Sequence, residues 1–196
     1  MRKDEQLKKI QTYVMNHFQE DTTGHDFFHM KRVAKTARMI AEQEFADLFI
    51  CEAAAWLHDI GDHKLFTNPT KALQELDLFL ESIGLATSNI KQIKTAMRDV
   101  SFSKGAVPTT LEGKIVQDAD RIDAIGAIGI ARTFAYGGAK GQFIYHDTYK
   151  DNTSIQHFYD KLLTLKECMH TKTAKQIACE RHKFMETYLE QFFREW

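Results

Sequence analysis

The chain has 196 residues, of which 43% are hydrophobic, and its formal net charge at pH 7 is −1. This length and apolar content are enough to build one buried core, so the sequence predicts a single domain over residues 1–196. The near-neutral balance excludes a strongly basic nucleic-acid binder, and no run of lysines or arginines suggests a membrane-surface patch.

No segment has the composition of a targeting or membrane element. Residues 1–19 are charged and amphipathic, without the apolar run of a secretory signal. No apolar stretch approaches the roughly 20 residues that cross a bilayer. The three cysteines (Cys51, Cys168 and Cys179) have no CxxC spacing and fall in helical patterns, so we expect reduced core residues rather than disulfides or a zinc site. These features together predict a cytoplasmic protein.

Apolar residues recur at the three- and four-residue spacing of helices from the start of the chain. Two stripes, in residues 7–18 and 33–41, each define one buried helical face. A third stripe runs through AAAWLHD and places His58 on the same face as Cys51 and Ala55. The first stripe contains Leu7, Ile10, Val14 and Phe18, and the second contains Val33, Ala37, Ile40 and Ala41.

Capping signals define the helices that follow. Asn68 is followed by a proline at the first helical position, and Gly84 closes that helix. Ser88 can cap the next helix. Helical spacing then resumes over residues 111–134, 155–165 and 174–193. With no repeat, linker or low-complexity tract, the sequence predicts an all-α fold.

Two long connections, residues 100–110 and 136–153, interrupt the helical pattern. Loops of this length in a compact helical domain are more often functional than idle. Each contains a lysine beside a glycine (Lys104 and Lys140), which would let backbone amides and an ammonium group approach an anion. An ordinary solvated loop is the alternative. Only residues 142–146 alternate as a half-buried strand would.

Histidines and aspartates stand out within the apolar helices. His58 and Asp59 are adjacent in AAAWLHDIGDH, at the end of an apolar helix, where the turn can aim both side chains at one ion. His29 opens the stripe that continues at Val33, so it faces the interior. We therefore expect these three groups to lie on the inner side of the helices that carry them.

Three carboxylates, Asp118, Asp120 and Asp123, occur in the otherwise apolar segment VQDADRIDAIG. Burial of a carboxylate is costly unless it is paired, hydrogen-bonded or bound to a metal. Taken alone, a buried histidine is more often a satisfied core residue, and Asp120 could pair with Arg32 or Arg121. Metal binding accounts for all these groups together, and a mixed nitrogen and oxygen set suits Mn, Fe, Co, Ni or Mg rather than closed structural zinc.

The ordered segments HMKRV, LHDIGD and DADRIDA resemble the motifs of the HD superfamily of metal-dependent phosphohydrolases. The longer segments TGHDFFHMKRV, AAAWLHDIGDHK, VSFSKG and LEGKIVQDADRIDAIGAIGIARTFAYGG are similar to a bacterial branch that contains nucleotide pyrophosphohydrolases. The similarity covers most of residues 20–140. It implies a compact helical HD-domain fold and hydrolysis of a phosphate ester or anhydride.

The resemblance also implies a ligand set for one divalent metal ion: His29, His58, Asp59 and Asp120. Two positions have competitors. His25 lies one helical turn before His29, which we favour because it stands three residues before the Arg-Val pair. Asp118 and Asp120 are about 200° apart on a helix, so only one can face the ion. We favour Asp120, which follows the alanine of the ADR pattern.

Two-metal members of the superfamily carry further histidines between the HD pair and the last aspartate. None occurs between His63 and Asp120, so we expect one ion. Asp59 is expected both to bind this ion and to contact the attacking water. Asp62 falls where relatives carry an acidic residue that orients or deprotonates the nucleophile, and is our candidate general base. A solvated carboxylate at a helix end is the alternative for Asp62.

Phosphate binding requires positive charge close to the ion, because the chain as a whole is nearly neutral. His63 and Lys64 follow the HD segment directly, and Lys104 lies in a glycine-bearing loop. We expect these three residues to contact the substrate.

The resemblance favours a phosphohydrolase of nucleotides that releases pyrophosphate from a nucleoside triphosphate, in preference to a nucleoside monophosphate phosphatase. A nucleotide-binding sensor or regulatory HD domain without turnover is the alternative from a different class. An intact ligand set together with Asp62 argues against it. We expect a small-molecule phosphate as partner, with no nucleic acid and no membrane. The apolar-rich final helix would also allow a homodimer.

Overall fold

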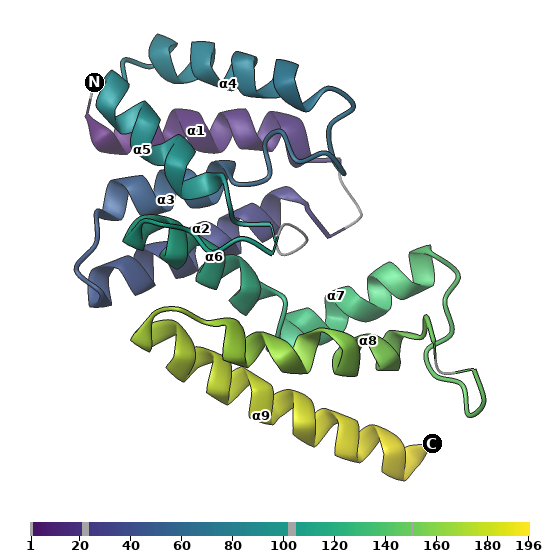
Figure 1. The fold of residues 1–196 in the computed structure, drawn as a ribbon. Coiled ribbons are helices and arrows are strands. Elements are labelled where there is room, and N and C mark those ends of the chain that lie inside the picture. Colours follow the sequence, from purple (N-terminus) through teal and green to yellow (C-terminus); the bar gives the residue numbers. More distant parts are fainter. Residues whose placement is uncertain (1, 21–23, 102–104, 150) are drawn as a thin grey trace.

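The computed structural model describes residues 2–20, 24–101, 105–149 and 151–196. Over these ranges the chain is helical and contains no strand, which confirms the predicted all-α fold (Figure 1). The elements are α1 (Lys3–Phe18), α2 (Phe27–Gln43), α3 (Leu48–Leu57), α4 (Pro69–Ser82), α5 (Thr87–Met97), α6 (Leu111–Asp123), α7 (Gly126–Ala139), α8 (Ser154–Asp160), the 3₁₀ helix η2 (Leu162–Cys168) and α9 (Lys172–Glu195).

Helix α3 lies at the centre of the core. Eight of its ten residues are buried, and it contacts α1, α2, α5 and α6. A helix that is apolar on every side is stable only when other elements surround it. Because α3 ends at Leu57, the His58-Asp59 pair begins inside the molecule and not on its surface.

Helices α1 to α6 form one group of packed elements around α3, and α7, α8, η2 and α9 form a second group. Helix α9 contacts α6, α7 and η2, and it reaches α2 (Figure 1). The carboxylate of Asp118, on α6, fixes the start of α9 because it accepts hydrogen bonds from the backbone N–H of His170 (2.9 Å), the backbone N–H of Thr171 (2.8 Å) and the Thr171 hydroxyl (2.8 Å). Helix α6 therefore joins the two groups.

Several predicted boundaries are confirmed and others are wrong. The Asn68 side chain accepts a hydrogen bond from the Lys71 backbone N–H (3.0 Å), and Gly84 adopts φ +71° just after α4. Ser88 does not cap α5, which begins at Thr87 with Ala86 at the cap position, two residues earlier than predicted. The helical pattern over 111–134 contains two helices, α6 and α7, and not one. The chain changes direction at Gly126, which has a φ of +77°.

The second long connection is shorter than expected, because α7 continues through Ala139. Residues 142–146 form no strand. Cys51 is buried, Cys168 is half-buried and Cys179 is exposed, so the expectation that all three cysteines lie in the core is confirmed only for Cys51. None of the helices in the described ranges is both long and apolar enough to span a bilayer.

Candidate metal centre

His29 lies in the first turn of α2 and is completely buried. The Asp26 side chain caps this helix by accepting a hydrogen bond from the His29 backbone N–H (2.6 Å). The cap fixes the start of the helix, so the imidazole points inward from its first turn.

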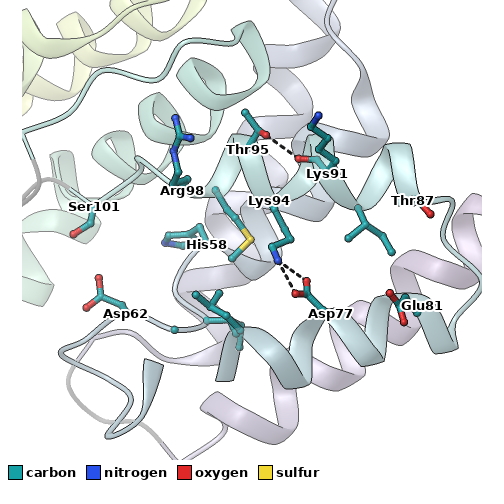
Figure 2. A pocket seen from close by; sticks show the side chains of 15 residues that line it. His58, Asp62, Asp77, Glu81, Thr87, Lys91, Lys94, Thr95, Arg98 and Ser101 are labelled. Carbon is teal, nitrogen blue, oxygen red and sulfur yellow. Dashed lines mark hydrogen bonds and ion pairs between the residues drawn. The ribbon is translucent and has the colours of Figure 1, made fainter. Parts of the chain in front are cut away.

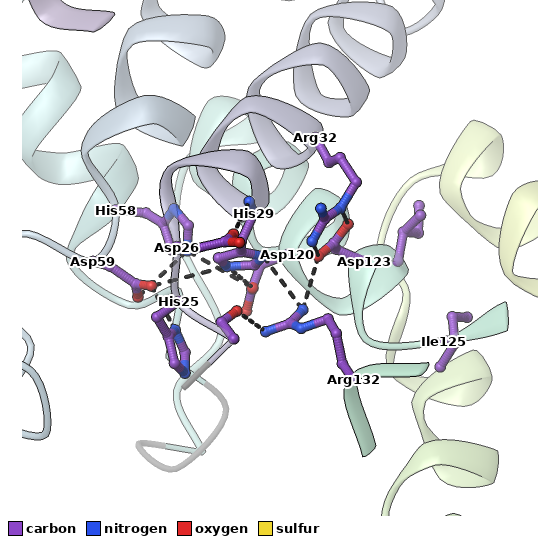
Figure 3. A network of polar contacts seen from close by, with 12 residues as sticks. His25, Asp26, His29, Arg32, His58, Asp59, Asp120, Asp123, Ile125 and Arg132 are labelled. Atoms are coloured by element: carbon purple, nitrogen blue, oxygen red, sulfur yellow. Dashed lines mark hydrogen bonds and ion pairs between the residues drawn. The ribbon is translucent and has the colours of Figure 1, made fainter. Parts of the chain in front are cut away.

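His58 and Asp59 lie in the turn that follows α3. The Nδ1 atom of His58 is 2.8 Å from the Ala55 backbone oxygen, which anchors the ring to the last turn of the helix. Gly61 adopts φ +81°, a left-handed conformation that strongly favours glycine, and so directs the chain away from the pair. Both side chains are buried and face α2 and α6 (Figure 3).

Asp120, on α6, completes the cluster. Its Oδ1 atom lies 3.5 Å from His29 Nε2 and 3.7 Å from His58 Nε2. Asp59 Oδ1 lies 3.4 Å from His58 Nε2, and Asp59 Oδ2 lies 3.9 Å from His29 Nε2. Ligand atoms about 2.1 Å from one ion, at angles of 90–110°, are about 3.0–3.5 Å apart. The observed distances are close to that range.

The protonation pattern of the two imidazoles fits a metal ion. His29 Nδ1 is 2.8 Å from an Asp123 oxygen and His58 Nδ1 faces a carbonyl oxygen, so each Nδ1 carries the proton. The Nε2 atoms of both rings are buried, and neither has a hydrogen-bond partner among the residues that the structure describes. Two buried lone pairs that face two carboxylates form a metal-binding-like cluster of histidines and aspartates.

Asp123 holds His29 from the side opposite the cluster (Figure 3). Its carboxylate accepts hydrogen bonds from His29 Nδ1, from Arg32 (2.7 and 3.0 Å) and from Arg132 (2.8 Å). Arg132 also donates to the Gly24 backbone oxygen (2.7 Å). A carboxylate on the outer nitrogen of a ligand histidine fixes the ring orientation and makes the inner nitrogen a better ligand.

His25 forms a second contact with the cluster. Its Nδ1 atom is 2.7 Å from Asp59 Oδ2, and the side chain remains 40% exposed. The described residues consequently contain two overlapping sets of potential ligand atoms, His25-His29-Asp59 and His29-His58-Asp120. The structure places both the predicted ligand and its competitor near Asp59, but only His29 lies near Asp120 as well.

Burial and neighbouring charges define the ionisation of the cluster. Burial lowers the pKa of His29 more than the hydrogen bond to Asp123 raises it, so the ring is neutral at pH 7. Burial alone would raise the pKa of Asp59, but His58 and the hydrogen bond from His25 outweigh it and leave that pKa well below its usual range. The centre therefore combines a neutral His29 ring with an ionised Asp59, a combination suited to a divalent cation.

Asp118 points away from this cluster, since all its hydrogen bonds described above go to the start of α9. Burial raises the pKa of Asp118, and the three hydrogen bonds oppose that shift. The alternative in which Asp118 replaces Asp120 is therefore not supported by the geometry.

The remaining predicted site residues lie in the loop after the HD pair. Asp62 Oδ1 accepts a hydrogen bond from the Lys64 backbone N–H (2.9 Å) and lies 3.5 Å from His63 Nδ1. The side chains of His63 and Lys64 are exposed, and the side chain of Asp62 is mostly buried. Lys104 lies outside the residues that the structure describes.

The two arginines named as alternative partners of Asp120 have other partners in the structure. Arg32 forms the bidentate contact with Asp123 described above. Arg121 donates to the Cys168 backbone oxygen and faces η2. Arg32 therefore pairs with Asp123. The alternative in which Arg32 pairs with Asp120 is not supported by these contacts.

Comparisons with known proteins identify the class to which this centre belongs. Residues 26–125 match the HD domain, and the chain therefore belongs to the HD-domain superfamily. This result confirms the family that the sequence motifs indicate.

Within the superfamily, the chain is similar to Bacillus subtilis YpgQ, with 41% identity over 97% of this chain and 94% of that protein. A crystal structure of YpgQ in complex with ADP superposes with a TM-score of 0.88 at 40% identity, covering 100% of this chain and 97% of that one. An HD-superfamily hydrolase from Bacillus thuringiensis gives a TM-score of 0.85 at 42% identity, covering 100% and 98% of the two chains.

Sequence reasoning missed the role of Asp123 and did not name Arg132. Asp123 lies three residues after Asp120, a spacing that places it on nearly the same side of the helix, and this was an available signal. Arg132 lies in the next helix, beyond the turn at Gly126. Its approach to Asp123 depends on the direction of that turn, which the sequence pattern does not specify.

Proposed function

We propose that this chain is a metal-dependent phosphohydrolase that acts on a nucleotide and releases pyrophosphate from a nucleoside triphosphate. The observation that carries the proposal is the pair of buried Nε2 atoms of His29 and His58, which face Asp59 and Asp120 and have no hydrogen-bond partner within the described ranges. The crystal structure of YpgQ with ADP supports a nucleotide as the ligand class. The preference for pyrophosphate release rests on the sequence resemblance.

One divalent ion (Mn, Mg, Co, Ni or Fe) would be held by His29, His58, Asp59 and Asp120. Such an ion lowers the pKa of a bound water and offsets the negative charge that develops on phosphoryl oxygens. In this arrangement the hydrogen bond between His25 and Asp59 Oδ2 orients the carboxylate, so that Asp59 Oδ1 faces His58. Asp123 keeps the His29 lone pair directed at the ion.

Asp62 is the proposed general base. The two contacts of its carboxylate named above both involve Oδ1, which fixes the rotamer and leaves Oδ2 to accept a proton or a hydrogen bond from water. The Lys64 backbone N–H donates to Oδ1 and so fixes the direction of the carboxylate. A positioned group of this kind contributes on the order of 10²–10⁴-fold to the rate.

His63, Lys64 and Lys104 are the proposed phosphate contacts. An ion with two carboxylate ligands is formally neutral, so it attracts a triphosphate only weakly over distance. His63 and Lys64 are exposed beside Asp62 and can therefore turn toward a phosphate chain without breaking a buried interaction. Each charged contact of this type is worth roughly 1.5–3 kcal/mol.

The test is turnover of a panel of nucleoside tri-, di- and monophosphates with Mn, Mg, Co and Ni, in which pyrophosphate and phosphate are measured separately. We expect pyrophosphate from triphosphates. Phosphate from monophosphates would favour the phosphatase alternative, and tight nucleotide binding with no product under any metal would favour a sensor.

Variants assign the roles within the site. His58→Ala should lose metal and activity together, whereas Asp62→Asn should keep the metal and lower kcat by about 10²–10⁴-fold. Lys64→Ala should raise KM without changing metal content, and Lys35→Ala, an exposed lysine on α2, is its matched control. Full activity of the Asp62→Asn variant would exclude Asp62 as the base.

A further inference from the structure

The two carboxylate oxygens of Asp59 face different partners. Oδ1 lies 3.4 Å from His58 Nε2, whereas Oδ2 lies 2.7 Å from His25 Nδ1 and 3.9 Å from His29 Nε2. An ionised carboxylate only accepts hydrogen bonds, so His25 Nδ1 carries a proton and donates it to Oδ2. One oxygen of Asp59 is therefore directed into the candidate centre, and the other is held by a half-exposed side chain at its edge.

We propose that His25 is a positioning residue that makes Asp59 bind the metal ion through one oxygen only, and so leaves a position on the ion open for water or a phosphoryl oxygen. In this role His25 does not bind the ion. The inference deepens the proposed function and rests on it, because it takes the cluster of two histidines and two aspartates to hold one divalent cation.

The number of ligand atoms makes the division of the Asp59 carboxylate important. Mg²⁺ and Mn²⁺ favour six ligand atoms in octahedral geometry. One atom from each of the four cluster residues leaves two positions for water and substrate. A carboxylate can also bind a cation through both oxygens. If Asp59 did so, only one position would remain, and the hydrogen bond from His25 to Oδ2 competes directly with that second contact.

The position of His25 is fixed from several sides. On one side along the chain, Arg132 donates to the Gly24 backbone oxygen (2.7 Å), and on the other, the Asp26 side chain caps α2. The His25 ring packs edge-on against the His29 ring, with 5.5 Å between the ring centroids (Figure 3). A donor that its neighbours already hold in place loses little further freedom when it binds the carboxylate, so it is suited to fix a ligand oxygen.

The candidate centre borders a cavity of about 640 Å³ between α4, α5 and the turn after α3. His58 and Asp62 line one end of this cavity (Figure 2). Because His58 belongs both to the cluster and to the cavity wall, water and small anions can approach the ion from this side. A second Asp59 oxygen on the ion would take a position that such a ligand could otherwise occupy.

The experiment compares His25→Ala with His25→Asn. The asparagine amide can place an N–H donor where Nδ1 stood, whereas alanine has no donor. The number of exchangeable waters on bound Mn²⁺ is measured from the relaxation of water protons, and Mn²⁺ affinity is measured by calorimetry. We expect one water fewer in His25→Ala than in the unmodified chain, and an unchanged number in His25→Asn.

Two affinities provide further readouts. The Mn²⁺ affinity of His25→Ala should fall by less than about tenfold, because the second Asp59 oxygen compensates for the lost orientation of the carboxylate. Binding of inorganic tripolyphosphate to the Mn²⁺-loaded chain should weaken about tenfold in His25→Ala, because one position on the ion is no longer open. His25→Asn should retain both affinities.

The sign of the change in bound water separates this role from others. One additional water in His25→Ala, with a large loss of Mn²⁺ affinity, would show that His25 is itself a ligand and would overturn the inference. An unchanged number of waters in His25→Ala would also overturn it, as would an equal loss in both variants. If His25→Ala does not fold, His25→Leu removes the same donor and occupies the space of the ring.

These measurements do not depend on turnover. Mn²⁺ binding without product in the nucleotide panel would refute the proposed reaction and leave this result unaffected. An unmodified chain that binds no Mn²⁺ would overturn both.

Discussion

Replacement of Asp123 by asparagine should separate support of the metal centre from direct ligation. Asp123 is only 4% exposed and accepts hydrogen bonds from His29, Arg32 and Arg132. An amide of the same shape loses the charge and turns an N–H donor toward other donors. The two guanidinium groups and the imidazole would then share one neutral carbonyl oxygen in place of a charged carboxylate with two acceptor oxygens.

The magnitude follows from these contacts. Loss of one partner of a buried ion pair costs about 3–5 kcal/mol. Arg32 and Arg132 keep 35% and 24% of their side chains exposed, so water compensates in part and we expect about 2–3 kcal/mol. For a chain of this size the melting temperature should fall by roughly 5–10 °C. Because the His29 ring is no longer fixed, metal affinity should fall about 10–100-fold.

The assay is competition for Mn²⁺ with a chelating dye, together with thermal unfolding followed by circular dichroism. Asp118→Asn is the control, because Asp118 is a buried carboxylate of the same helix whose bonds go to α9. That variant should lose stability but retain its metal affinity. Mn²⁺ affinity equal to that of the unmodified chain in a destabilised Asp123→Asn variant would refute the reasoning.

The pH dependence of the same variant provides a second check. Burial raises the pKa of Asp123, but the hydrogen bonds from His29 and Arg32 outweigh burial and hold that pKa well below its usual range. The folded state therefore binds this proton less readily than the unfolded chain, in which the pKa is about 3.9. The stabilisation is complete above about pH 4 and is lost as the pH falls further. The stability difference between the two proteins should shrink only in that acidic range.

Three further predictions concern other parts of the molecule. Gly61→Ala should destabilise the fold by about 1–2 kcal/mol from the left-handed backbone alone, with a further cost from the contact with Leu73, measured by urea unfolding. Burial raises the pKa of Cys51 to about 12, so above about pH 9 only the unfolded thiol ionises, and stability should fall by up to about 1.4 kcal/mol per pH unit, a slope that Cys51→Ala lacks. Mn²⁺ at a hundred times its Kd should raise the free energy of unfolding by about 2.7 kcal/mol over the value in EDTA, an increment that His58→Ala abolishes in calorimetry.

The helices could be predicted well because apolar spacing and capping residues act locally. The stripes beginning at Leu7 and Val33 are buried as expected, and Asn68 caps α4. The division at Gly126 was missed, because a helical pattern of side chains continues across a turn that changes only the direction of the chain. Apolar periodicity reports which residues are buried but not where two helices meet at an angle.

The candidate site was predicted only in part, because motifs in the sequence are local and the contacts that orient the site residues are not. Residues that lie in recognisable motifs, such as His58 and Asp120, come together in the structure. The contacts that orient them connect separate elements: His25 reaches Asp59 across 34 residues, and Arg132 reaches back to Gly24 across 108. No local pattern predicts such contacts, because they depend on how the elements pack.

The three aspartates of α6 make the spacing of residues along this helix the property on which the candidate centre depends. Asp118 serves the start of α9, Asp120 faces the candidate centre and Asp123 holds His29, so their spacing distributes three tasks around one helix. An insertion of a single residue between the first and last of these aspartates would rotate everything after it by about 100°. We therefore expect relatives with other substrates to vary in length in the connections after α3 and α7, and not within α6.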